Sequence, residues 1–306
     1  MSLASPPATD APGSALQGAL LVVAAGACWS LAGLFVRAME GADAWQILVY
    51  RSAGTLIFVL GLLALRAGGS PLPAIKALGW RGPLAGAALA AAMLLFILAL
   101  TKTAVFNVVM MLCTAPLMAA FLGRIFLGET VRPATVLAML IAVVGVAVMV
   151  WAGLDLGTFS GVLLSLAPPF CFAVFTVMLR AAKVQDTLPT VAWAGLIGLI
   201  ASLILVFAEG QSPVISLHDM LLALAMGSLQ IGLGMLFFTA GAKRLSAAEA
   251  TLLSLSEVVL APIWVWIAFN EVPDGATLVG GGILFGAMVL QAASGLRRRR
   301  PPIGLA

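Results

Sequence analysis

Apolar residues run in ten long stretches along this chain, and charged residues collect at the ends of those stretches. The stretches cover approximately residues 16–36, 44–66, 80–100, 103–126, 133–151, 159–179, 188–208, 218–241, 247–268 and 275–295. In helical form, at about 1.5 Å per residue, each is long enough to cross a hydrocarbon core of about 30 Å. Lipid offers no hydrogen-bond partners to the backbone, so each spanning segment has to satisfy its own N–H and C=O groups. The pattern therefore predicts an all-α membrane protein with ten transmembrane helices.

Composition agrees with this fold class. Hydrophobic residues make up 62% of the chain and charged residues only 9%, whereas about a quarter of the residues in a soluble domain are charged. The segments between the stretches are too short for a soluble domain. Residues 1–15, rich in Ser, Pro and Ala, are expected to form a disordered cytoplasmic tail, and residues 296–306 a basic cytoplasmic tail.

The basic residues fall mainly on one side of the ten stretches. With the N-terminus in the cytoplasm, thirteen of the 16 Lys and Arg residues lie in cytoplasmic loops or the C-terminal tail. This bias predicts cytoplasmic N- and C-termini in a multi-pass protein of a bacterial-type inner (plasma) membrane. The net charge of +4 then suits a lipid surface as partner, with no nucleic acid.

We expect no cofactor and no metal site. The three cysteines lie within separate apolar stretches, where we expect them to pack as small hydrophobic residues. The one histidine, His218, stands at the outer start of the eighth stretch, away from all three. Tetrahedral zinc sites need several such ligands close together, and the sequence offers none.

The chain contains an internal repeat. A shift of 142 residues places the first five stretches on the last five, with Glu129 on Glu271 and Thr135 on Thr277. A repeat of five spans reverses direction in the membrane, so the chain divides into two inverted five-helix repeats, residues 16–151 and 159–295. Proline recurs in corresponding helices, with Pro116 in the fourth and Pro262 in the ninth.

These matched breaks favour a substrate path between the halves, with Pro116 and Pro262 as hinges. The first and sixth helices carry a second pair of breaks, at Gly26-Ala27 and Pro168-Pro169. The alternative is that the prolines only kink helices for packing.

Motifs in both halves carry a family resemblance. They are Cys28-Trp29-Ser30, Arg51, Pro116, Leu127-Gly128-Glu129-Thr130, Ser256-Glu257 and Asn270-Glu271. From about residue 16 to 295 the chain resembles the drug/metabolite transporter superfamily in its EamA-type branch, and within it the YddG-type amino-acid exporters. The second half of that pattern usually reads Glu-Pro-Val, whereas here Val258 follows Glu257 and the proline comes later, as Pro262.

The resemblance implies a central cavity ringed by helices one to four and six to nine, with the fifth and tenth at the periphery. Polar and aromatic mid-membrane positions on those helices are the expected substrate-binding residues: Trp29, Ser30, Tyr50, Phe96, Asn107, Met111, Phe172, Phe175, Trp193, Gln230, Phe238 and Trp264. A wall of aromatic and methionine side chains suits a hydrophobic or aromatic solute. For any one aromatic residue, ordinary helix packing is an equal alternative.

Two charges lie deep in the predicted spans and complete the candidate site. Arg51 stands about two turns into the second helix and Glu257 well inside the ninth. Each charge costs roughly 2.5–3.5 kcal/mol at the centre of a membrane helix, so neither is expected to face lipid. Arg51 either attracts a substrate carboxylate or has a structural role, in which it snorkels to the interface or pairs with a helix C-terminus. Glu257 either carries a coupling proton or braces the helix.

The resulting prediction is a secondary transporter that exports small metabolites, aromatic or apolar amino acids first, by alternating access. No Gly-x-x-x-x-Gly-Lys motif is present for ATP. The alternatives are efflux of drugs and lipophilic cations, a channel, and an intramembrane enzyme. The enzyme is disfavoured, because His-Glu-x-x-His and Gly-x-Ser-x-Gly are both missing from the sequence. A monomer and a homodimer both remain open, the latter through Gly282 and Gly286 of the tenth helix.

Overall fold

The structure is a computed structural model that describes residues 12–128, 133–155, 159–182, 186–242, 244, 253–254, 256–273 and 275–296. Within these ranges every regular element is a helix, as the apolar pattern predicts. The expected terminal tails, Glu129 and the start of the ninth expected span lie almost wholly outside the described residues.

The first half of the chain begins with α1 (Pro12–Ser30), α2 (Ala32–Ala38), α3 (Ala44–Ala67) and α4 (Leu72–Lys76). It continues with α5 (Arg81–Lys102), α6 (Val105–Leu112), α7 (Ala115–Leu127) and α8 (Pro133–Asp155).

The second half begins with α9 (Phe159–Leu164), α10 (Ala167–Ala181), α11 (Leu188–Ala208) and α12 (Leu217–Ala225). A π-helix, η1 (Met226–Leu233), joins α12 to α13 (Gly234–Ala242), and α15 (Ser256–Phe269) and α16 (Gly275–Leu296) follow.

Seven helical segments among the described residues are long and apolar enough to cross a membrane: Leu16–Ala38, Ala44–Ala67, Arg81–Lys102, Val105–Leu127, Phe159–Leu179, Leu188–Ala208 and Leu217–Ala242. The apolar helical stretches Val136–Trp151, Ser256–Phe269 and Leu278–Ala287 are shorter. They coincide with parts of the fifth, ninth and tenth spans that the sequence predicts, although Ser256–Phe269 ends one residue after the predicted ninth span.

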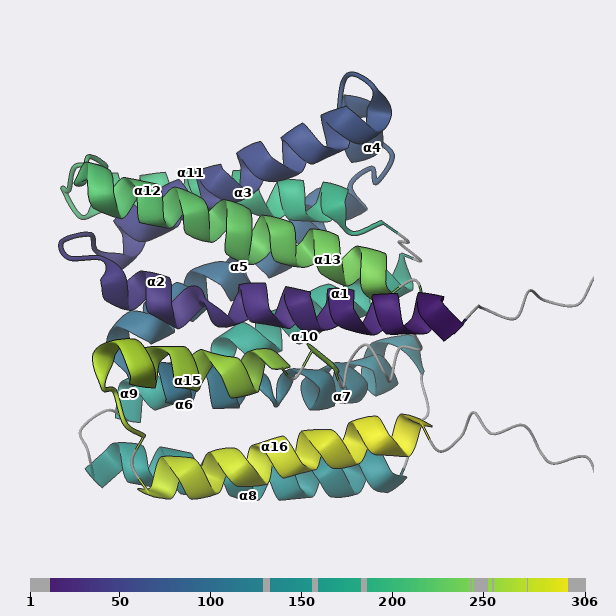
Figure 1. Cartoon of the computed structure of the whole chain (residues 1–306), viewed down its shortest axis with the longest axis vertical. Helices are drawn as coiled ribbons and strands as arrows, with labels where there is room; N and C mark the ends of the chain where they lie inside the picture. Colours follow the sequence, from purple (N-terminus) through teal and green to yellow (C-terminus); the bar gives the residue numbers. More distant parts are fainter. Residues whose placement is uncertain are drawn as a thin grey trace, which may run out of the picture.

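The helices lie side by side in one bundle, and the start of α1 and the end of α16 lie at the same end of it (Figure 1). Helices α8 and α16 pack against each other at one edge, as the resemblance implies for the fifth and tenth spans. Helix α3 packs along α11, α5 packs against α10 and α11, and α1 packs against α13 and α15. The resulting core is almost wholly aliphatic and includes Leu48, Ile97, Leu100 and Met111.

Among the described residues, three of the spans are broken. The first breaks at Leu31, between α1 and α2, and the fourth at Cys113-Thr114, between α6 and α7. The sixth breaks between α9 and α10. There the backbone nitrogens of Ser165 and Leu166 donate to the carbonyls three residues earlier, those of Val162 and Leu163. Such breaks leave polar backbone groups inside the bundle, where side chains can reach them.

The breaks differ in part from the sequence prediction. The fourth span breaks immediately before Pro116, as expected. Helix α15 instead runs on through Pro262 without interruption, so the break predicted at Pro262 is wrong. A proline has no backbone N–H, so one carbonyl of the helix loses its hydrogen bond. Inside a bundle, groups of neighbouring helices can satisfy that carbonyl, and the helix continues. Likewise α1 continues through Gly26 and Ala27 and ends only at Ser30.

Candidate functional site

A buried arginine lies near the middle of the bundle. Arg51, about two turns after the start of α3, has only 1% of its surface exposed, so its side chain does not snorkel to the interface. Its Nη2 donates to Oε1 of Gln230 at 3.3 Å. Its Nε and Nη1 are buried without a hydrogen-bond partner. The guanidinium therefore has unused donors in an apolar interior.

Gln230 reaches Arg51 from the π-helix η1, which follows α12. A π-turn holds one more residue than an α-turn, and such turns are common at functional sites. The backbones of η1 and α3 touch closely, because an added Cβ at Gly227 would collide with the Arg51 carbonyl. Thr55 bridges the same crossing by donating to the carbonyls of Arg51 at 3.0 Å and Gly227 at 3.2 Å.

The end of α1 adds an aromatic and a hydroxyl group to this pair. Gln230 donates its amide N–H to the Trp29 carbonyl at 3.4 Å. The Trp29 ring lies beside that of Phe238 on α13, with centroids 5.3 Å apart. Ser30 donates to the Ala27 carbonyl at 2.7 Å.

Ser30 also accepts from Nε1 of Trp264 on α15 at 2.9 Å. Five elements thus supply one set of residues linked by side-chain and backbone contacts, which we call the central cluster: Arg51, Gln230, Trp29, Ser30, Phe238 and Trp264. All six were predicted from the sequence as site residues.

Glu257 lies close to this cluster without being bonded to it. It stands in the first turn of α15, half-buried, and its backbone nitrogen lies near Gly26 on α1. The neighbouring Ser256 has its hydroxyl buried with no partner. Helix α15 therefore crosses α1 one turn before the break that presents Trp29 and Ser30.

The remaining predicted residues are dispersed. Phe96 and Met111 are buried in the aliphatic core, and the Asn107 amide donates to the Thr103 hydroxyl at 3.0 Å. Tyr50 donates to the Pro213 carbonyl at 2.9 Å. Its hydroxyl thus fastens α3 to the loop that follows α11.

Three aromatic residues of the second half lie near α5. Phe175 is buried in a second aliphatic cluster, and its ring lies 5.7 Å from that of Phe172, which is 45% exposed. Trp193 on α11 packs against Gly82 and Gly86 on α5, where added Cβ atoms would collide with it. Its position indicates helix packing, although its indole nitrogen has no partner.

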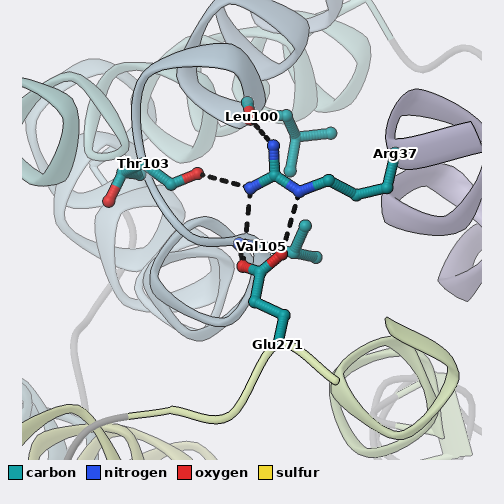
Figure 2. A network of polar contacts seen from close by, with 5 residues as sticks. All are labelled: Arg37, Leu100, Thr103, Val105 and Glu271. Carbon is teal, nitrogen blue, oxygen red and sulfur yellow. Dashed lines mark hydrogen bonds and ion pairs between the residues drawn. The ribbon is translucent and has the colours of Figure 1, made fainter. Parts of the chain in front are cut away.

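One end of the bundle is closed by a network that the sequence analysis missed (Figure 2). Nε of Arg37, from α2, donates to Oε2 of Glu271 at 2.8 Å. Arg37 also donates to the carbonyls of Leu100 at 3.4 Å and Thr103 at 3.2 Å. Oε1 of Glu271 accepts from the backbone nitrogen of Val105 at 2.9 Å. The pair ties α2, the α5–α6 junction and the segment after α15 together.

A second acidic group braces the same end. Asp219, on the first turn of α12, is 1% exposed. It accepts from the backbone nitrogens of Glu40, Gly41 and Ala42 at 3.0–3.1 Å, and His218 Nδ1 lies 3.2 Å from it. The loop between α2 and α3 is therefore held against α12.

The opposite end contains a cavity of about 310 Å³. It lies between the start of α5, the end of α10 and the start of α11. Residues Gly82, Ala85, Met178, Leu179 and Thr190 are among those that line it, with Trp80 and Arg81 at its edge. The described bundle thus has one end held by the Arg37–Glu271 and Asp219 contacts and an opposite end with this cavity.

Comparison with known proteins gives a family and a fold. A family model described as "EamA-like transporter family" matches residues 16–151 and 159–292, and so covers both halves of the chain. A solved structure titled "Crystal structure of protein" is similar with a TM-score of 0.63 and 20% sequence identity, over 94% of this chain and 100% of that one. A search of curated proteins finds no match.

Proposed function

Because this chain belongs to the EamA-like transporter family, we propose that it is a secondary transporter that exports small metabolites, amino acids with apolar or aromatic side chains first among them. The observation that carries the proposal is the central cluster. It gathers a guanidinium, an amide and aromatic rings from five elements in the middle of apolar helices. Polar groups are costly at such a position unless they serve a solute or each other.

In this proposal the chain crosses the membrane ten times as two inverted repeats. Two related packings support the inversion, because α8 pairs with α16 and α3 with α11, each helix with its counterpart under the 142-residue shift. The packing of α5 against α10 is likewise matched by that of α13 against α1. A two-fold axis in the membrane plane relates contacts in this way.

The substrate site lies between the repeats, at the central cluster. Its first-half residues come from α1 and α3 and its second-half residues from η1, α13 and α15. Rocking of one repeat against the other exposes the cluster to each side of the membrane in turn. The basic ends of the helices orient the termini toward the cytoplasm, so the Arg37–Glu271 network is the external closure.

Growth of cells that overproduce the protein tests the substrate. They should tolerate toxic analogues of phenylalanine and leucine better than cells with an empty vector, because export lowers the internal concentration. A matched strain carrying Arg51→Gln should lose the tolerance while the protein still reaches the membrane. Tolerance of tetraphenylphosphonium in place of the analogues would replace this proposal with efflux of lipophilic cations.

A further inference from the structure

Arg51 is a buried cation without a counter-charge among the described residues. Its Nε and Nη1 have no partner, and these two atoms carry three of the five N–H donors of a guanidinium. Its one hydrogen bond is to the neutral amide of Gln230. A buried charge left in this state costs several kcal/mol, which a hydrogen-bonded anion offsets.

Two of the described acidic groups near the bundle interior are bonded to other groups. Asp219 accepts three backbone N–H groups of the α2–α3 loop, and Glu271 pairs with Arg37. No ion pair joins Glu257 to Arg51 in the described part of the chain. None of the described acidic groups therefore supplies the anion that Arg51 lacks, whereas a bound anionic ligand can.

The surroundings of Arg51 define what kind of anion fits. Gln230 connects the guanidinium to the Trp29 carbonyl, and the Trp29 ring lies against that of Phe238. The aromatic pair therefore belongs to the residue whose backbone carbonyl Gln230 binds, one amide away from the guanidinium. Guanidinium groups bind carboxylates through paired N–H donors, and aromatic rings bind apolar bodies.

We propose that Arg51 and Gln230 form a subsite for a carboxylate that is joined to an apolar or aromatic body. The inference rests on the proposed function for its role in transport and narrows the substrate to carboxylates. The carboxylate is the required head group, and an ammonium group is dispensable, because no acid among the described residues is hydrogen-bonded to the cluster. Aromatic acids that lack an amino group are therefore substrates, and aromatic amines are not.

Calorimetric titration of the purified protein tests the subsite with three probes of equal ring size. Hydrocinnamate and phenylalanine should bind, and phenethylamine should bind at least about tenfold more weakly, equivalent to about 1.4 kcal/mol. Equal binding of phenethylamine would overturn the subsite. So would equal competition by sodium chloride at the same concentration, which would mark a general anion site.

Two substitutions separate recognition from folding. Gln230→Glu places a carboxylate where Oε1 of Gln230 lies, 3.3 Å from Nη2 of Arg51. It should raise the thermal unfolding midpoint and weaken hydrocinnamate binding at least about tenfold. Arg51→Lys retains the charge but loses the paired donors, and should weaken binding while the fold persists.

Arg66→Gln is the matched control, because Arg66 lies on the same helix but is 40% exposed and pairs with Asp186 at 3.9 Å. It should leave hydrocinnamate binding unchanged. Wild-type affinity in Gln230→Glu, together with a lowered midpoint, contradicts the subsite. Equal transport of hydrocinnamate, phenylalanine and phenethylamine would overturn the subsite but not the proposed function. Selective binding of the two carboxylates without transport would overturn the proposed function but not the subsite.

Discussion

Replacing Glu271 by Gln should open the end of the bundle that the proposed orientation places outside the cell. The wild-type carboxylate accepts from Nε of Arg37 at 2.8 Å, from Nη2 at 3.4 Å, and from the Val105 nitrogen at 2.9 Å. The amide of the variant retains one acceptor oxygen and presents its NH₂ group to a donor. The variant thus loses the ion pair and at least one hydrogen bond with little change in shape.

The magnitude follows from burial and bond type. Hydrogen bonds to charged groups contribute about 1.5–3 kcal/mol when buried, and solvent screening reduces this for exposed pairs. The Arg37 and Glu271 side chains are 30% and 25% exposed, so we expect a net loss of about 1–2 kcal/mol. If the network exists only in the externally closed state, the open fraction rises roughly 5–30-fold.

Labelling of a single cysteine measures this shift. Cys28, Cys113 and Cys171 are replaced, and Ala104→Cys is introduced, because Ala104 and Glu271 line the same small cavity of about 10 Å³. A membrane-impermeant maleimide added outside should label this site roughly 5–30-fold faster in Glu271→Gln.

Two control variants test whether a faster labelling rate is specific to the Arg37–Glu271 network. Asp186→Asn removes an exposed 3.9 Å pair with Arg66 and should leave the labelling rate unchanged. The charge exchange Arg37→Glu with Glu271→Arg should restore slow labelling in part. An unchanged rate in a folded Glu271→Gln protein would refute the assignment of this network as a closure.

Three further outcomes are expected. Glu257→Gln should leave substrate exchange and uphill accumulation unchanged at every pH; loss of accumulation alone would assign a coupling proton to Glu257. Trp29→Ala should raise the KM for phenylalanine several-fold without loss of fold, since it removes from beside Phe238 a ring that the substrate ring would contact, and an aromatic pair contributes about 0.5–1.5 kcal/mol beyond burial; an unchanged KM in flux assays would exclude Trp29 from the site. Asp219→Ala removes the acceptor of three backbone N–H groups and should lower stability by about 1–3 kcal/mol in thermal unfolding, since water reaches the exposed Glu40 and Gly41; a wild-type midpoint would contradict the brace.

The positions of the helices follow from the sequence to within a few residues. The second and seventh spans, expected at 44–66 and 188–208, are Ala44–Ala67 and Leu188–Ala208. The agreement follows from the lipid environment, because a single apolar segment satisfies its backbone hydrogen bonds there by forming an α-helix. Local motifs sharpen the ends, as with Asp43, which caps α3 by accepting from the backbone nitrogens of Trp45 and Gln46.

Side-chain partners were harder to predict. Arg37 and Glu271 stand 234 positions apart, and only packing of the two halves brings them together. The one sequence signal was that the repeat places Glu271 on Glu129. Tyr50 and Trp193 have the residue types of a binding site. In the structure, however, Tyr50 donates to the loop after α11, and Trp193 packs against glycines of α5. The π-helix around Gln230 has no apolar pattern that distinguishes it from an α-helix.

Counterflow in proteoliposomes tests the central claim most directly. Purified protein is reconstituted with unlabelled phenylalanine inside, and labelled phenylalanine is added outside in trace amount. An alternating-access transporter accumulates the label transiently, because internal substrate returns the site to the outer face. The account predicts this overshoot in the wild type, its loss in Arg51→Gln, and its retention in Arg66→Gln. Equilibration without overshoot, at a rate that does not saturate with substrate, would indicate a channel and contradict the account.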